Sequence, residues 1–245
     1  MAKPPPYDGL RAALDEQCSL LVPALAAADP LAPSGCAGWT VADLDRHLGT
    51  VLARLGQLVA RALPGVADTG VAGWAAALPG LASAADTQAR EPSAPGLAAV
   101  VPVLRPVLHG ADPAHVVTQL TGTHTVADAV LFRVIETVVH GLDLPEPVPP
   151  APRALRFVVK ALAGVLTERA PGRSVEVRVP PHAAVQCVEG PRHTRGTPPN
   201  TVEADPLAFV LLCTGRRAWG AAVADGSVRA SGDRADLSGL LPLLS

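Results

Sequence analysis

Residues 125–140 read TVADAVLFRVIETVVH and are apolar around almost the whole circumference of a helix. This pattern indicates a helix that is buried on most of its faces. The run opens on Thr125, with Asp128 three positions later, a combination that favours a helix N-terminus. We therefore predict a core helix over 125–140.

The same four residues, TVAD, stand at positions 40–43, and apolar side chains follow them at spacings of three and four. They predict a second helix, with Thr40 as its cap. An earlier apolar pattern begins after Asp8, which can cap a first helix. A further helix is predicted around 97–108, although it contains Pro102 and Pro106. Together these patterns predict a four-helix bundle.

Five prolines between positions 145 and 152 interrupt the helical patterns, and neither a helix interior nor a central strand accepts them. We interpret this stretch as a polyproline linker that divides the chain into domains 1–144 and 153–245. The elements predicted after it are helices over 153–169, 206–214 and 237–244, strands over 174–179 and 183–188, and a hairpin about Asp225-Gly226 that pairs 221–223 with 228–230. This second part is predicted to be α+β with an antiparallel sheet.

The composition excludes several classes of function. Of 245 residues, 49% are hydrophobic, 17% are charged and 3% are aromatic, with a net charge of −2. These values argue against disorder and against nucleic acid as a partner. No apolar run is long enough for a membrane span, and the N-terminus lacks the apolar core of a signal peptide. The four cysteines are scattered and form no CxxC pair, so we expect reduced thiols and a cytoplasmic protein.

One polar stripe interrupts the apolar helix 125–140. It consists of Arg133, Glu136 and His140, at spacings of three and four. Glu136 and His140 can point at one metal ion, since a carboxylate in a core helix is costly unless it is paired or binds a metal. The alternative interpretation is an Arg133–Glu136 ion pair beside a core histidine.

His47, on the helix that begins at Thr40, could supply a third ligand. Taken by itself, its alternative interpretation is a histidine at the surface or beside the apolar seam of that helix. Two histidines and one carboxylate from two helices make a three-ligand site that leaves positions open for water or substrate. Asp43, one turn earlier, could orient the imidazole of His47 or could serve only as the partner of the Thr40 cap.

The other titratable side chains offer weaker candidates. His109, His115 and His124 have no fixed spacing to a carboxylate, and we predict that they lie on the surface. No cysteine has a neighbouring histidine or lysine in the sequence that would lower the pKa of its thiol, so a cysteine nucleophile is not supported.

Two segments carry a resemblance to a known family. WTVADLDRHL at 39–48 and RVIETVVHGLD at 133–143 resemble the actinobacterial mycothiol-dependent maleylpyruvate isomerase family, within the DinB-like metal-binding bundles. The resemblance implies a divalent metal, usually zinc, held at the positions that match the motif: His47, Glu136 and His140. It also implies mycothiol as cofactor and a small electrophilic substrate. Between 64 and 122 no family residues are found.

The second part resembles sterol-carrier-protein-2-like domains, through TVEADPLAFVLLCTGR at 201–216, DGSVRASGD at 225–233 and the final leucines. In the isomerase relatives a C-terminal-domain arginine helps to hold the anionic substrate. Arg216 is therefore the candidate catalytic residue, with Arg217 as its neighbour. The alternative interpretation is a cation that stabilises the C-terminal end of helix 206–214.

Two functions from different classes follow. The first is a mycothiol-dependent isomerase or transferase, in which a metal-bound thiolate adds to the substrate. The second is a non-catalytic, sterol-carrier-like protein that binds a lipid in its C-terminal domain, beside a structural helical domain. Leu207, Phe209, Val210 and the predicted helix 237–244 would line the cavity, although the ordinary interpretation of these residues is a hydrophobic core. Bound zinc without lipid would favour the enzyme, and lipid without zinc would favour the carrier.

Overall fold

The computed structural model describes residues 6–190 and 199–244. The chain divides into two compact units, Met1–Phe157 and Val158–Ser245, and the division lies within a helix. The predicted domain limits, 1–144 and 153–245, rest on the proline-rich segment just before it. No helix in the described ranges is both long and apolar enough to cross a membrane.

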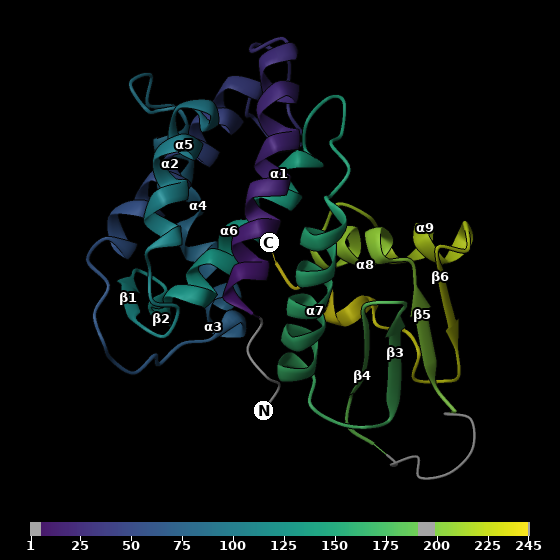
Figure 1. Ribbon diagram of the computed structural model, residues 1–245. Coiled ribbons are helices and arrows are strands. Elements are labelled where there is room, and N and C mark those ends of the chain that lie inside the picture. The colour runs from purple at the N-terminus through teal and green to yellow at the C-terminus, as the bar shows by residue number, and fades with distance from the viewer. Residues whose placement is uncertain (1–5, 191–198, 245) are drawn as a thin grey trace. The chain divides into compact units, whose positions relative to one another are not determined.

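Four helices form a closed ring in the first unit (Figure 1). They are α1 (Tyr7–Ala27), α2 (Val41–Val59), α5 (Leu97–His109) and α6 (Val126–Gly141). Helix α2 packs against α5, α5 against α1, α1 against α6, and α6 against α2. The predicted four-helix bundle is therefore confirmed, and its core consists of the apolar faces that the sequence pattern indicated.

The helix starts follow local side-chain chemistry. Thr40 accepts a hydrogen bond from the Asp43 backbone, and Asp43 accepts one in return, which completes a capping box. At the start of α6, Thr125 Oγ1 accepts a hydrogen bond from the Asp128 N–H and donates one to the Asp128 carboxylate. The predicted cap at Asp8 is wrong, because α1 begins one residue earlier and Asp8 forms an ion pair with Arg11 on the first turn instead.

Short elements fill the connection between α2 and α6. They are α3 (Val71–Ala77), a 3₁₀ turn (Leu78–Leu81), α4 (Ala82–Ala89) and the hairpin strands β1 (Val116–Gln119) and β2 (Gly122–Thr125). The prediction that His124 lies on the surface is wrong. This residue in β2 is fully buried, and its ring contacts the Phe132 ring edge-on and bonds to the Thr69 carbonyl. His109 is exposed and His115 is partly exposed.

The proline-rich segment belongs to the first unit and packs within it. Val148 and Ala151 are buried, and the Ala151 backbone N–H donates to the Gln17 side chain at 2.8 Å. The Val148 N–H donates to the Gly141 carbonyl at the end of α6. These two hydrogen bonds hold the linker along α1 and α6. Residues 145–151 are neither helix nor strand, as expected for a stretch so rich in proline.

The second unit is a mixed four-stranded sheet with helices. Helix α7 (Pro152–Arg169) precedes the sheet in the sequence. The strands are β3 (Val175–Val179), β4 (Ala183–Cys187), β5 (Thr201–Ala204) and β6 (Val228–Ser231). Between β5 and β6 the chain forms two short helices, α8 (Pro206–Cys213) and α9 (Trp219–Ala224). The sheet order is β4-β3-β5-β6 (Figure 1), with antiparallel outer pairs and a parallel β3–β5 pair. The parallel pair arises because β5, which the sequence pattern missed, lies beside β3.

Two predicted elements in this unit are wrong for identifiable reasons. Residues 221–223 belong to α9, and Gly226, in the left-handed region with φ +78°, follows the end of that helix rather than turning a hairpin. Residues 237–244 form only a 3₁₀ turn at Ser238–Leu240. Leu241, which precedes a proline, is extended, and the Leu243 and Leu244 N–H groups donate to the Cys213 carbonyl.

Candidate metal centre

The capped starts of α2 and α6 determine where the predicted histidines lie. His47 is about two turns after Thr40, and His140 is in the last turn of α6. Because α2 packs against α6, the two imidazoles approach each other. Their ring centroids are 5.0 Å apart, and the rings meet edge to face. The Trp39 ring lies beside both, with centroids 5.1 Å from His47 and 6.4 Å from His140.

The environment of His47 suits a neutral metal ligand. The residue is 7% exposed, and its Nδ1 is buried without a hydrogen-bond partner. Burial lowers the pKa of His47 well below its usual value, and His140 and Arg133 nearby lower it further. The imidazole is therefore neutral near pH 7, which is the form that binds a metal.

Glu136 lies one turn before His140 and contacts Arg133. The distance from Arg133 Nη1 to Glu136 Oε2 is 2.8 Å, which is the ion pair that the alternative interpretation predicted. Yet Oε2 is buried and has no partner with hydrogen-bond geometry. The Arg133–Glu136 contact is therefore an ion pair by distance but does not have the geometry of a hydrogen bond.

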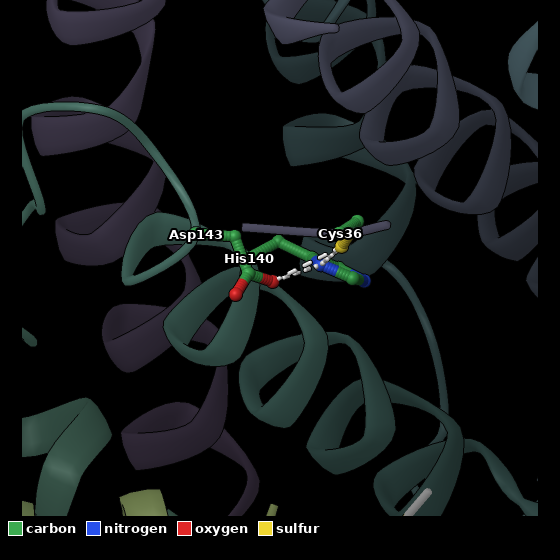
Figure 2. Close-up of side chains that lie close together, drawn as sticks. All are labelled: Cys36, His140 and Asp143. Atoms are coloured by element: carbon green, nitrogen blue, oxygen red, sulfur yellow. Dashed lines mark hydrogen bonds and ion pairs between the residues drawn. The ribbon is translucent and has the colours of Figure 1, made fainter. Parts of the chain in front are cut away.

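Asp143 and Cys36 meet His140 on one side of its ring (Figure 2). Asp143 Oδ2 is 2.9 Å from His140 Nδ1, and Cys36 Sγ is 3.6 Å from the same nitrogen. The i, i+3 spacing of His140 and Asp143 was visible in the sequence. Cys36 could not have been found that way, because it lies 104 residues before His140. Cys36 therefore has a histidine neighbour in the folded protein, although no histidine lies beside it in the sequence.

Asp43 acts as a helix cap. Its carboxylate accepts hydrogen bonds from the Thr40 backbone at 2.9 Å and from the Thr40 hydroxyl at 2.7 Å, and it pairs with Arg46 at 2.6 Å. It does not contact His47 Nδ1, which has no partner. Of the two roles considered for Asp43, the structure supports the cap.

In the part of the chain that the structure describes, only Cys36, His140 and Asp143 bring three possible ligand atoms within 4.8 Å of one another, so the predicted set His47, Glu136 and His140 is not gathered that closely. Among the described residues, five buried side-chain polar atoms lack a hydrogen-bond partner, and two of them are His47 Nδ1 and Glu136 Oε2. Buried polar atoms are nearly always satisfied. Glu136 Oε2 lies 2.8 Å from Arg133 Nη1, so its charge is paired, whereas His47 Nδ1 has no hydrogen-bond partner. Two imidazoles and a carboxylate suit zinc and several other divalent metals.

Arg216 and Arg217 contact their own unit. Arg216 Nη1 donates to the Thr214 carbonyl at 2.9 Å, at the end of α8. Arg217 forms an ion pair with Asp225. The Arg216 contact is the one expected from a cation at the C-terminal end of a helix. Neither contact bears on whether the guanidinium of Arg216 holds a substrate, which stays a prediction.

The comparisons agree with this description of both parts of the chain. A family model described as mycothiol maleylpyruvate isomerase N-terminal domain matches residues 11–145, and one described as bacterial SCP ortholog matches residues 152–243. No curated protein matches.

Two solved structures resemble the chain along its length. One is the crystal structure of the mycothiol-dependent maleylpyruvate isomerase, with a TM-score of 0.61, and the other is a histidine-to-alanine mutant described by the same enzyme name, with a TM-score of 0.60. Each is 15% identical, and each comparison covers 95% of both chains. At this identity the likeness establishes the fold, whereas the model match over 11–145 establishes the family. The chain belongs to the family of the mycothiol maleylpyruvate isomerase N-terminal domain.

Proposed function

We propose that this protein is a cytoplasmic, mycothiol-dependent metalloenzyme of the maleylpyruvate isomerase or thiol-transferase type. His47, Glu136 and His140 would hold the divalent metal, most simply zinc. The observation that carries the proposal is the approach of two imidazoles: the ring centroids of His47 and His140 are 5.0 Å apart, and His47 Nδ1 is buried without a hydrogen-bond partner. The family match and the titles of the structural neighbours supply the thiol and the reaction class.

The chemistry assigned to the bound cation is that of a Lewis acid, which favours the thiolate form of a thiol and so makes it nucleophilic at neutral pH. The chain's own residues prepare the site. Burial keeps His47 neutral, and Asp143 holds the His140 ring through Nδ1. The Trp39 ring lies against both imidazoles and limits their contact with water. Arg133 places a positive charge 2.8 Å from Glu136 Oε2.

Metal removal tests this proposal directly. We expect the purified protein to contain about one equivalent of zinc per chain and to convert maleylpyruvate in the presence of mycothiol. Chelation should lower turnover on the order of 1,000-fold, which corresponds to about 4 kcal/mol and matches the several kcal/mol that a metal ion supplies. Added zinc should restore turnover. Circular dichroism before and after chelation serves as the control for folding.

The result that would contradict the proposal is full turnover after complete metal removal. Mass spectrometry of the same preparation tests the lipid-carrier alternative, because a stoichiometric lipid without zinc would favour it. In the second unit Phe209 and Val210 are buried, and Leu207 is 39% exposed.

Arg216 is proposed to bind the carboxylate of the substrate, since a planar guanidinium can grip a carboxylate with two hydrogen bonds. Arg216→Ala should then lower turnover and raise KM while leaving the metal content unchanged, because a group that acts on the substrate is not a ligand. Arg217→Ala and the double variant should be assayed beside it. Full activity in all three variants would exclude a clamp at either arginine, and would leave Arg216 as the cation at the end of α8.

A further inference from the structure

A second set of metal-ligating atoms lies on the Nδ1 side of His140. Cys36 Sγ, His140 Nδ1 and a carboxylate oxygen of Asp143 all lie within 4.8 Å of one another (Figure 2). The individual distances are 3.6 Å from Sγ to Nδ1, 3.3 Å from Sγ to Oδ2, and 2.9 Å from Nδ1 to Oδ2. A thiol, an imidazole and a carboxylate together are typical zinc ligands.

Several hydrogen bonds hold the turn that carries Cys36 in place. The Cys36 N–H donates to Ser34 Oγ at 3.2 Å, and the Cys36 carbonyl accepts from the Trp39 N–H at 3.0 Å. Gly35 donates to the Asp143 carbonyl at 2.6 Å, and a Cβ at Gly35 would lie only 2.9 Å from Asp143 Oδ1. The absence of a side chain at Gly35 therefore brings the turn close enough for Cys36 to reach the end of α6.

Cys36 is also the accessible cysteine of the chain. It is partly exposed, whereas Cys18, Cys187 and Cys213 are buried. Burial raises the pKa of Cys18 to about 12 and that of Cys187 to about 11, which keeps both as inert thiols. Cys36 is therefore the thiol that a cation in solution can reach most readily.

The arrangement does not suit a nucleophilic cysteine. In a Cys–His–Asp relay, the base takes the thiol proton on one ring nitrogen, and the carboxylate holds the other nitrogen. Here Cys36 and Asp143 approach the same nitrogen, Nδ1. The three groups converge on one point, as ligands of an ion do.

We propose that Cys36, His140 and Asp143 form a second cation site, which takes a thiophilic divalent ion such as Zn²⁺. Around a tetrahedral zinc, bonds of about 2.0–2.3 Å place ligand atoms about 3.3–3.6 Å apart. Two of the three observed distances match, and the Nδ1–Oδ2 distance must open by only a few tenths of an ångström, on the order of a normal ligand adjustment. The thiol releases its proton to solvent as the ion binds.

The two sites exclude each other, a consequence that rests on the proposed function. A neutral imidazole has one nitrogen lone pair available and carries its proton on the other nitrogen. In Figure 2 the second ring nitrogen of His140 points away from Cys36 and Asp143. An ion held at Nδ1 places the proton on Nε2, and His140 can then no longer serve the His47–Glu136 site through Nε2. A thiophilic ion at Cys36 thus switches the first site off.

Cobalt titration of the full chain tests the second site. Cobalt bound to a thiolate gives an intense near-ultraviolet charge-transfer band, which nitrogen and oxygen ligands do not produce. In metal-free His47→Ala protein, where the first site is impaired, we expect Co²⁺ to produce this band. The double variant His47→Ala/Cys36→Ser should lose it, and His47→Ala/Cys18→Ala, the matched thiol control, should keep it. Glu136→Gln replaces His47→Ala if that variant fails to fold.

Alkylation provides a second readout. In His47→Ala protein, at a zinc concentration a hundredfold above the dissociation constant, mass action leaves about 1% of the second site open, so iodoacetamide should modify Cys36 about 100-fold more slowly than without zinc. Absence of the band in folded His47→Ala protein, or alkylation unaffected by zinc, overturns the second site. The first site is read separately in Cys36→Ser, which should bind one Co²⁺ without the band. If Cys36→Ser binds no cobalt, the proposed function fails, whatever His47→Ala shows.

Discussion

His47→Ala is expected to abolish metal binding at the His47–Glu136–His140 site and turnover with mycothiol together. The imidazole is buried and neutral, its ring centroid lies 5.0 Å from that of His140, and its removal takes away one of the three proposed ligands. Loss of an outer-shell partner costs about 10–100-fold in metal affinity, and loss of a ligand should exceed that range. Metal content by elemental analysis and turnover of maleylpyruvate are the measurements.

His115→Ala is the matched control, because it removes a partly exposed imidazole whose partner is Asp112 rather than a residue of the site. It should retain metal and turnover. If His47→Ala keeps one equivalent of metal and full activity, and Cys36→Ser shows that this metal does not depend on the thiol, His47 is not a ligand.

Glu136→Gln separates the two interpretations of the Arg133–Glu136 pair within the same prediction. The amide keeps the size of the carboxylate and removes its charge. If Glu136 only neutralises Arg133, the variant should be less stable but should hold its metal. If Glu136 is a ligand, as we propose, metal content should fall along with turnover.

Gly49→Ala is expected to destabilise the first unit more than any surface substitution. Gly49 is on α2, two residues after His47, and a Cβ there would overlap the Pro95 carbonyl oxygen and lie 2.8 Å from the Gly96 carbonyl carbon. Both are backbone atoms, so the α2–α5 contact must open. Overpacking of this kind costs about 1–3 kcal/mol and sometimes more. Urea unfolding followed by circular dichroism measures the change.

Gly56→Ala supplies the control on the same helix. A Cβ at Gly56 would lie 3.3 Å from a methyl group of Leu104, which can move. Because alanine favours a helix over glycine, this variant should be neutral or more stable by up to about 1 kcal/mol. A Gly49→Ala protein as stable as Gly56→Ala would show that α2 and α5 are not packed as closely as described.

The sequence alone determined the bundle helices because their signals are local. Thr40 and Thr125 each bind a backbone N–H three residues later, and apolar side chains at spacings of three and four follow. The strict alternation over 174–179 likewise predicted β3. In each case the information lies within a few residues, so the pattern and the fold agree.

Other elements depended on partners distant in sequence. Asp225-Gly226 is compatible with a hairpin or with a helix end, and residues 219–224 adopt the helix. The leucines of 237–244 have a helical spacing, but the backbone before Pro242 is extended and the Leu243 N–H bonds to Cys213. His124 looks like a surface residue until Phe132 and Thr69 cover it.

Part of the candidate site likewise follows from local spacing in the sequence, and part depends on contacts between distant segments. The spacing of Glu136, His140 and Asp143 places them on one end of α6, and that much is a property of the sequence. The 5.0 Å approach of His47 to His140 requires α2 to pack against α6. The approach of Cys36 requires Gly35 to pack against Asp143. Only the tertiary structure decides such contacts, because helix periodicity determines which face a side chain occupies but not which distant segment covers that face.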